Sequence, residues 1–193
     1  MLERLKDQLL AMQAKDSEVR AELQAAGLLS DGYHFQMEEV HQENARQLLS
    51  IIEEHGWPHE VLVGQEGAEA AWLIAQHSIG EPGFMRQCRD LLEEASRLKL
   101  SPRWQYAYID DRIRVFEGKG QRFGTQIDIK PTGPEFYQLE DPSEVSTWRK
   151  EAGLGTVRSA LAKFRSCPLP SPEEYEAKQA QSNVWRRKIG WVS

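Results

Sequence analysis

The stretch 64–78, GQEGAEAAWLIAQHS, constrains the fold more than any other part of this chain. It predicts a helix that is apolar on almost every side, and such helices are normally buried among other helices. Four of its polar residues nevertheless fall within about a quarter of the helix circumference: Glu66, Glu69, Gln76 and His77. Because buried polar groups cost free energy unless they are paired, we expect this arc to face other polar groups or a ligand.

Length and charge limit the class of protein. A chain of 193 residues is long enough for one well-formed core. The net charge of -6 argues against non-specific binding to nucleic acid or an anionic membrane. The N-terminus lacks the apolar core of a signal peptide, and no stretch approaches the roughly 20 apolar residues of a membrane span. We therefore predict a cytoplasmic protein without nucleic-acid or membrane partners, in which Cys88 and Cys167 are reduced.

Apolar residues recur at helical spacing along most of the chain, which predicts a mainly α (α+β) fold. We expect a compact helical domain over 1–167 around the buried central helix, with one small β-hairpin near 124–139. A proline-rich linker and a helical C-terminal tail are expected over 168–193. The other helices are predicted at about 2–26, 36–55, 82–95, 102–116 and 156–164, with a short one after Asp141-Pro142. Residues 112–116 also alternate as a strand would, so the sequence allows either a helix or a strand there.

Two polar residues interrupt these apolar series. Asp16 occupies an inward position of the first helix, and Arg20 lies one turn further on. Asp16 is either a tolerated polar residue at a frayed seam or half of an internal Asp–Arg pair, or it is an acid that points inward as part of a site. Asn44 interrupts the inner face of the second helix in the same way.

The familiar catalytic and metal-binding motifs are absent from the sequence. It contains no Walker loop, GxSxG elbow, HExxH helix or dinucleotide fingerprint. His55 and His59 straddle Gly56 and Pro58, so they do not share a helical face. His34 and His41 are equally unconvincing as ligands, and we therefore predict no metal site and leave the cofactor unknown.

The candidate site therefore rests on polar residues at positions expected to be inside. His77 is the predicted general base, because histidine titrates near neutrality, and a carboxylate from another helix must orient it. Asp111 is one possibility for that role, and Arg112 is a predicted anion ligand. The further predicted ligand-binding residues are Gln76, Gln121, Thr125, Gln126, Glu69, Asp16 and Asn44. The alternative is a satisfied buried network that fixes the register of the helices.

Several of these residues also carry a resemblance. The motifs are Gly56-Trp57-Pro58, Trp72-Leu-x-x-Gln-His77, Asp111-Arg112-Ile113 and the loop from Gly118 to Gln126, with weaker matches at Asp16, Arg20, Asn44 and Glu140-Asp141-Pro142. With them the chain resembles a family of uncharacterised bacterial proteins over about residues 9–154. Ser17 departs from the glutamine of that family. The resemblance supports the choice of residues and implies no reaction.

The leading functional hypothesis is a small-molecule-binding pocket with hydrolase or transferase activity, in which His77 is the general base. In this hypothesis the central helix, the Asp111-Arg112 element and the loop 124–126 surround one polar pocket. The alternative is a non-catalytic inhibitor or accessory factor that binds a protein partner through the N-terminal helix or the tail. The protein is expected to be a monomer or a homodimer.

Overall fold

The computed structural model of the chain describes residues 2–28 and 33–192. Most of these residues are helical, and one two-stranded antiparallel hairpin accompanies the helices, so the predicted mainly α class is confirmed. The chain divides into two tightly packed units, residues 1–101 and 102–193. The division predicted between residues 167 and 168 stays a prediction.

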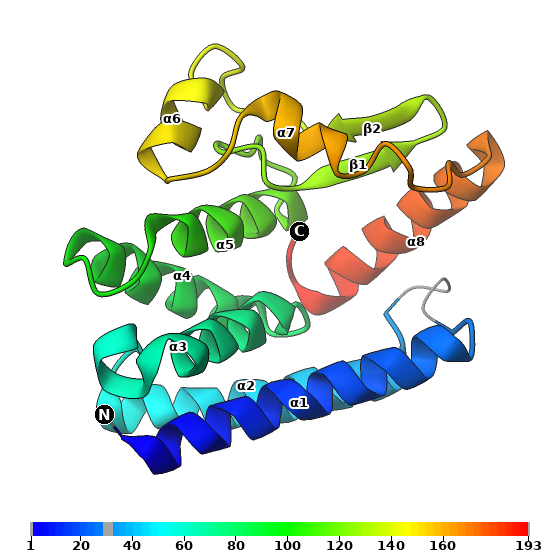
Figure 1. Ribbon diagram of the computed structural model, residues 1–193. Helices are drawn as coiled ribbons and strands as arrows, with labels where there is room; N and C mark the ends of the chain where they lie inside the picture. Colours follow the sequence, from blue (N-terminus) through cyan, green and yellow to red (C-terminus); the bar gives the residue numbers. More distant parts are fainter. Residues whose placement is uncertain (1, 29–32, 193) are drawn as a thin grey trace. The chain divides into compact units, whose positions relative to one another are not determined.

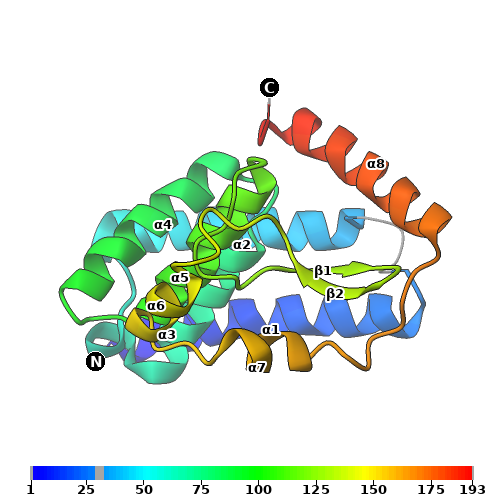
Figure 2. The ribbon, with the colours of Figure 1, turned by 90° about the horizontal axis from the view of Figure 1, so that it is seen from above.

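Four helices build the first unit: α1 (Glu3–Ala25), α2 (Phe35–His55), α3 (Glu60–His77) and α4 (Pro82–Arg97). In Figures 1 and 2, α1 and α2 lie side by side. The helix α3 packs against α1, α2 and α4, which makes it the centre of this unit, as its apolar sequence predicts. The largest fully buried side chains of the unit include Leu9, Leu48, Ile74, Met85 and Leu92.

The helix α3 begins earlier than predicted. Residues 61–63, expected to lead into the helix, belong to a first helical turn that ends at Gly64. Gly64 has φ 72° and ψ 169°, a conformation that residues with a side chain rarely adopt. The helix therefore changes direction there, and Val63 is fully buried at the break.

The polar arc of α3 is buried only at its C-terminal end. Glu66 is exposed and pairs with Lys6 of α1 at 2.6 Å, and exposed Glu69 accepts a hydrogen bond from Gln65. In this half of α3 the small residues around Gly67 are the buried ones, so the arc stays in solvent. The expectation that the whole arc faces a polar interior was therefore wrong for Glu66 and Glu69.

The second unit contains four helices and the hairpin. Its helices are α5 (Arg103–Phe116), α6 (Val145–Glu151), α7 (Val157–Ala162) and α8 (Pro172–Ile189). The strands β1 (Ile127–Lys130) and β2 (Gly133–Phe136) pair in the register Ile127↔Phe136, and α7 lies beside β2 (Figure 1). Residues 112–116 are helical, which settles the alternative left open by the sequence.

The C-terminal helix α8 is capped at its start and anchored at its end within the second unit. Ser171 and Glu174 form a reciprocal capping box at its start. Near its end, Arg186 Nη1 donates to the carbonyl oxygens of Val115 and Phe116 at 2.9 and 3.2 Å, at the C-terminal end of α5. The buried Trp191 ring stacks on Phe116 with ring centroids 5.1 Å apart. The helical tail is thus confirmed, and its aromatic residues pack inside the unit.

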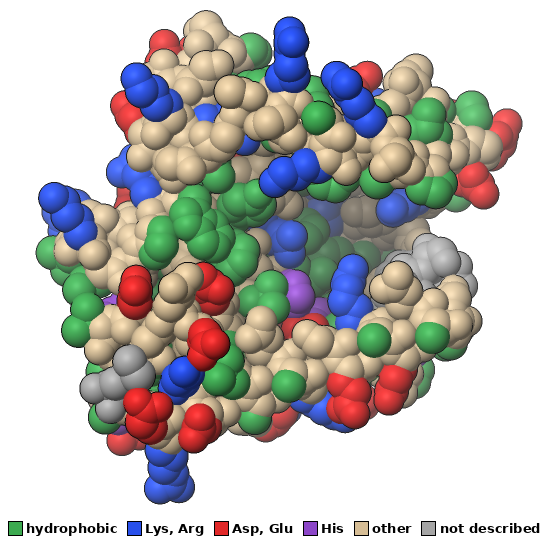
Figure 3. All heavy atoms as spheres, viewed as in Figure 1, with side chains coloured by type: hydrophobic (Ala, Val, Ile, Leu, Met, Phe, Trp, Pro, Cys, Tyr) green, Lys and Arg blue, Asp and Glu red, His purple; other side chains and the backbone are tan. Residues whose placement is uncertain are grey.

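The described parts of the chain contain no helix long and apolar enough to cross a membrane. On the face drawn in Figure 3, basic and acidic side chains are interspersed, and no continuous basic patch covers that face. The expectation that nucleic acid is not a partner stays a prediction.

Candidate functional site

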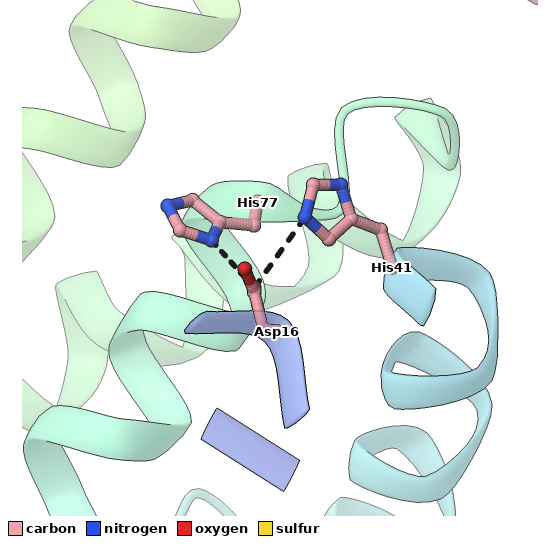
Figure 4. A group of neighbouring side chains, drawn as sticks. All are labelled: Asp16, His41 and His77. Atoms are coloured by element: carbon pink, nitrogen blue, oxygen red, sulfur yellow. Dashed lines mark hydrogen bonds and ion pairs between the residues drawn. The ribbon is translucent and has the colours of Figure 1, made fainter. Parts of the chain in front are cut away.

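Three helices of the first unit bring polar side chains together around Asp16 of α1 (Figure 4). Asp16 continues the inward series of Met12 and Val19, and only 2% of its surface is exposed. An ionised carboxylate this deeply buried needs partners, because transfer from water costs several kcal/mol. Its partners are two histidines, His41 of α2 and His77 of α3.

His77 is the closest partner of Asp16. It is the last residue of α3, and its Nδ1 lies 2.6 Å from Asp16 Oδ2. Because an ionised carboxylate only accepts hydrogen bonds, Nδ1 must carry the hydrogen, and in the neutral ring Nε2 then holds the lone pair. Nε2 points away from Asp16 in Figure 4, and 23% of the His77 side chain is exposed. This is the geometry of an oriented base.

The two histidines set the charge state of Asp16. Burial disfavours its carboxylate form, but the contacts with His41 and His77 hold the pKa of Asp16 well below its ordinary value. Asp16 is therefore ionised at neutral pH. The alternative Asp16–Arg20 pair is replaced by these contacts, and Arg20 is exposed.

His41 is the residue that sequence reasoning dismissed. It is buried, and its Nε2 lies 3.4 Å from the same Asp16 oxygen that contacts His77. On the other side of the ring, Nδ1 lies 2.7 Å from the Tyr33 hydroxyl, and the two rings stack. Its spacing from Asn44 and Leu48 places His41 on the inner face of α2, and this was the signal that could have found it.

The donor atoms of Asp16, His41 and His77 all lie within 4.8 Å of one another. A carboxylate and two imidazoles form a donor set able to hold a metal ion. Spacing along the sequence does not reveal this set, because its members come from three different helices. His41, which its spacing in the sequence set aside as a ligand, is one of the three members of this set.

Two further predicted residues lie in the first unit. Asn44 Nδ2 donates to the carbonyl oxygen of Met12 at 3.2 Å and so ties α2 to α1 one turn from Asp16. This bond supports the network interpretation for Asn44. Gln76 is buried beside His77 in the chain. Glu69 lies on the exposed part of α3, outside this group.

Asp111, in the second unit, holds a loop. It is fully buried on α5, and its carboxylate accepts hydrogen bonds from the backbone N–H groups of Arg122, Phe123 and Thr125 at 2.7, 3.0 and 2.9 Å. The Thr125 hydroxyl adds a fourth bond at 3.0 Å. Burial raises the pKa of Asp111, and these hydrogen bonds oppose the rise. The carboxylate that orients His77 is therefore Asp16, where the sequence suggested Asp111.

The glutamines of the same loop also bind its backbone. Buried Gln121 donates from Nε2 to the carbonyl oxygen of Gln126 and accepts from the Gln126 N–H, both at 2.9 Å. The Gln126 amide donates to the Thr125 hydroxyl at 3.0 Å. Arg149 of α6 donates to the carbonyl oxygen of Phe123 at 2.6 Å, which fixes the loop from the other side. Arg112 is half-buried on α5.

The predicted residues thus form two groups, one in each unit. Asp16, Asn44, Gln76 and His77 belong to the first unit, and His41 joins them. Asp111, Arg112, Gln121, Thr125 and Gln126 belong to the second. The single pocket expected to combine the two groups stays a prediction.

One comparison with known proteins finds a family to which the chain is similar. The model of a family described as "Family of unknown function (DUF6624)" matches residues 3–164. The chain belongs to this family. No curated protein and no solved structure matches the chain. The match confirms the resemblance to a family without an established activity, and it includes both groups of residues and ends before α8.

Proposed function

We propose that the first unit carries a small-molecule site with hydrolase or transferase activity, in which His77 is the general base. The observation that carries this proposal is the 2.6 Å contact between His77 Nδ1 and the buried carboxylate of Asp16. It fixes the ring and its tautomer, and it leaves Nε2 on the partly exposed side.

Proton transfer follows from this geometry. Nε2 accepts a proton from a water molecule or from a hydroxyl of the bound molecule, and the oxygen attacks an electrophilic carbon or phosphorus. The bond from that atom to its leaving group then breaks, and the leaving group takes the proton from Nε2. The imidazolium formed in this step carries a positive charge next to the Asp16 carboxylate. An ionised partner at 2.6 Å stabilises that charge strongly, because the surroundings are poor in water. Asp16 therefore acts by orienting His77 and by stabilising its protonated form.

The competing hypothesis is a non-catalytic factor that binds a protein partner. One of its two expected contact surfaces was the tail, with Trp185 and Trp191. Both rings lie against Phe116 within the second unit, with ring centroids 5.7 and 5.1 Å away. These contacts favour a structural use of the tail, and the oriented His77 favours the catalytic proposal.

The test begins with a thermal-shift screen of the full chain against metabolites, because a ligand of the folded state raises the melting temperature. Hits are then incubated with wild type, His77→Gln and the matched control His55→Gln, and product formation is followed by NMR. His55 is a histidine of the same unit outside the cluster. We expect turnover by wild type and His55→Gln, and a loss of about 100-fold or more in His77→Gln, the scale of general-base catalysis.

Two results would contradict the proposal. One is equal turnover by His77→Gln and wild type. The other is a screen without hits in which His77→Gln loses its fold by circular dichroism, because the cluster would then be a structural network.

A further inference from the structure

The cluster around Asp16 has a feature that the general-base role of His77 leaves unused. His41 Nε2 is buried and has no hydrogen-bond partner among the residues that the structure describes. It is aimed at Asp16 Oδ2 from 3.4 Å (Figure 4). A buried polar atom without a partner costs roughly 1–3 kcal/mol, so its retention calls for an explanation.

We propose that Asp16, His41 and His77 bind one divalent transition-metal ion of the zinc class. The ion is bound by Asp16 Oδ2, His41 Nε2 and His77 Nδ1. Metal binding at these atoms goes beyond the proposed function and does not depend on it.

The distances already approach those of such a site. Donor atoms bound to one zinc ion at about 2.0–2.2 Å lie roughly 3.2–3.5 Å apart in a tetrahedral arrangement. The 3.4 Å between His41 Nε2 and Asp16 Oδ2 falls in this range. The 2.6 Å between His77 Nδ1 and Asp16 Oδ2 must open by about 1 Å or less. Since all three atoms lie within 4.8 Å of one another, small side-chain rotations bring them to a common centre.

The second layer around His41 fits a metal ligand. A histidine that binds a metal through one ring nitrogen donates from the other to a fixed acceptor. For His41 that acceptor is the Tyr33 hydroxyl, 2.7 Å from Nδ1. A hydroxyl both donates and accepts, so it supports Nδ1 with or without a hydrogen. His41 can therefore release Nε2 to an ion while Nδ1 stays paired.

The donor chemistry selects the class of ion. Two imidazoles and one carboxylate suit zinc, cobalt, nickel or ferrous iron. Magnesium and calcium prefer oxygen ligands, and only one of these three donors is oxygen. The carboxylate of buried Asp16 further favours a cation. Three protein ligands also leave at least one position for water or a bound molecule.

Metal binding also has a consequence for His77, and this consequence rests on the proposed function. In the metal-free site Nδ1 holds the hydrogen and Nε2 the lone pair. With the ion on Nδ1, the neutral ring carries its hydrogen on Nε2, which then no longer accepts a proton. The ion and the base function of His77 therefore exclude each other.

The first experiment measures metal binding by the full chain after chelator treatment and dialysis. Zinc is titrated by calorimetry, and cobalt by its visible absorption, which reports coordination by nitrogen and oxygen. We expect one site in wild type, and a loss of affinity of ~100-fold or more in His41→Ala, since removal of a second-layer partner alone costs 10–100-fold. The control His55→Ala should bind as wild type does. Circular dichroism checks that both variants are folded.

Equal affinity of His41→Ala and wild type would overturn the proposal, as would the absence of a saturable site in wild type. If His41→Ala does not fold, Tyr33→Phe replaces it as the diagnostic variant. It keeps all three ligands and loses the hydroxyl that supports His41. A 10-fold or larger loss of zinc affinity is then expected, and an unchanged affinity overturns the proposal.

A second readout separates failure of this inference from failure of the proposed function. Diethyl pyrocarbonate acylates unprotonated, accessible imidazole nitrogens, and the modified peptides are quantified by mass spectrometry. We expect His77 to react in metal-free protein and to be protected by zinc, while His55 reacts equally in both. Reaction of His77 without zinc protection removes the metal inference and keeps the base. If zinc binds but His77 is unreactive in metal-free protein, the base role of His77 is removed and the metal site is kept.

Discussion

Two buried aspartates, one in each unit, show how the same side chain serves different ends. Asp16 contacts two imidazoles, and imidazole as a chemical group accepts protons and binds metals. Asp111 is bound by three backbone N–H groups and a hydroxyl, which do neither. The two carboxylates therefore differ in what their partners can do. Those of Asp16 are groups able to bind a proton or a metal ion, and those of Asp111 hold a loop in place.

The titration of the two carboxyl groups follows the same division. The histidines lower the pKa of Asp16, whereas burial raises the pKa of Asp111 against the pull of its donors. The loop around Asp111 takes its shape only in the folded chain, so the hydrogen bonds of Asp111 stabilise the folded state. The contacts of Asp16 leave one imidazole partly open to solvent.

The largest expected effect is that of Asp111→Ala. The change leaves three backbone N–H groups without their acceptor, and each such buried group costs roughly 1–3 kcal/mol. We expect a loss of about 3–5 kcal/mol in the free energy of unfolding, measured by urea denaturation. Asp141→Ala is the control, because exposed Asp141 accepts local bonds, among them two from Ser143. A loss below about 1 kcal/mol in Asp111→Ala would refute the anchoring role.

A smaller loss is expected for Gln121→Leu. Leucine fills similar volume but breaks the two bonds to the Gln126 backbone and a third to the carbonyl oxygen of Tyr137. The expected loss is about 2–3 kcal/mol in the same urea assay. Gln138→Leu, at an exposed position of the same unit, is the comparison. If Gln121 instead served a ligand, its replacement would leave stability nearly unchanged.

Asp16→Asn should change the pH dependence of stability. The folded-state pKa of Asp16 lies below its unfolded value of about 3.9, so its contribution is present above that pH and lost as the pH falls. Wild type should therefore lose stability more steeply than Asp16→Asn between about pH 5 and pH 2. Metal-free protein is used for thermal unfolding at each pH. Parallel curves for the two proteins would mean that the histidines do not perturb Asp16.

The two aspartates also mark how far sequence reasoning reaches. Asp16 was recognisable because it breaks an apolar series on one helix. The central helix was recognisable because it is apolar on almost every side. His41 was missed because its partners lie on other helices, and their meeting depends on how three helices pack.

The loop around Asp111 posed a different problem. Its residues were recognised, but amide and carboxylate groups bind a ligand and the protein backbone with the same geometry. Only the backbone positions of 121–126 tell the two uses apart. The prediction that the polar arc of α3 is buried was wrong for Glu66 and Glu69. Periodicity shows which side of a helix faces inward, but not which of its turns are covered by other helices.

The smallest effect on stability, and the finest test of the comparison, is Tyr33→Phe. It removes one partly buried hydroxyl, so we expect a loss of about 0.5–1.5 kcal/mol from the hydrogen bond to His41. Urea denaturation of metal-free protein measures this loss, and a repeat with saturating zinc measures the added stabilisation. If His41 is a ligand supported by Tyr33, zinc stabilises the variant less than wild type, because weaker binding to the folded state gives less stabilisation by mass action. Equal stabilisation of the two proteins would mean that the Tyr33–His41 pair only stabilises the fold, like the bonds around Asp111. The functional group of residues would then consist of Asp16 and His77 without His41.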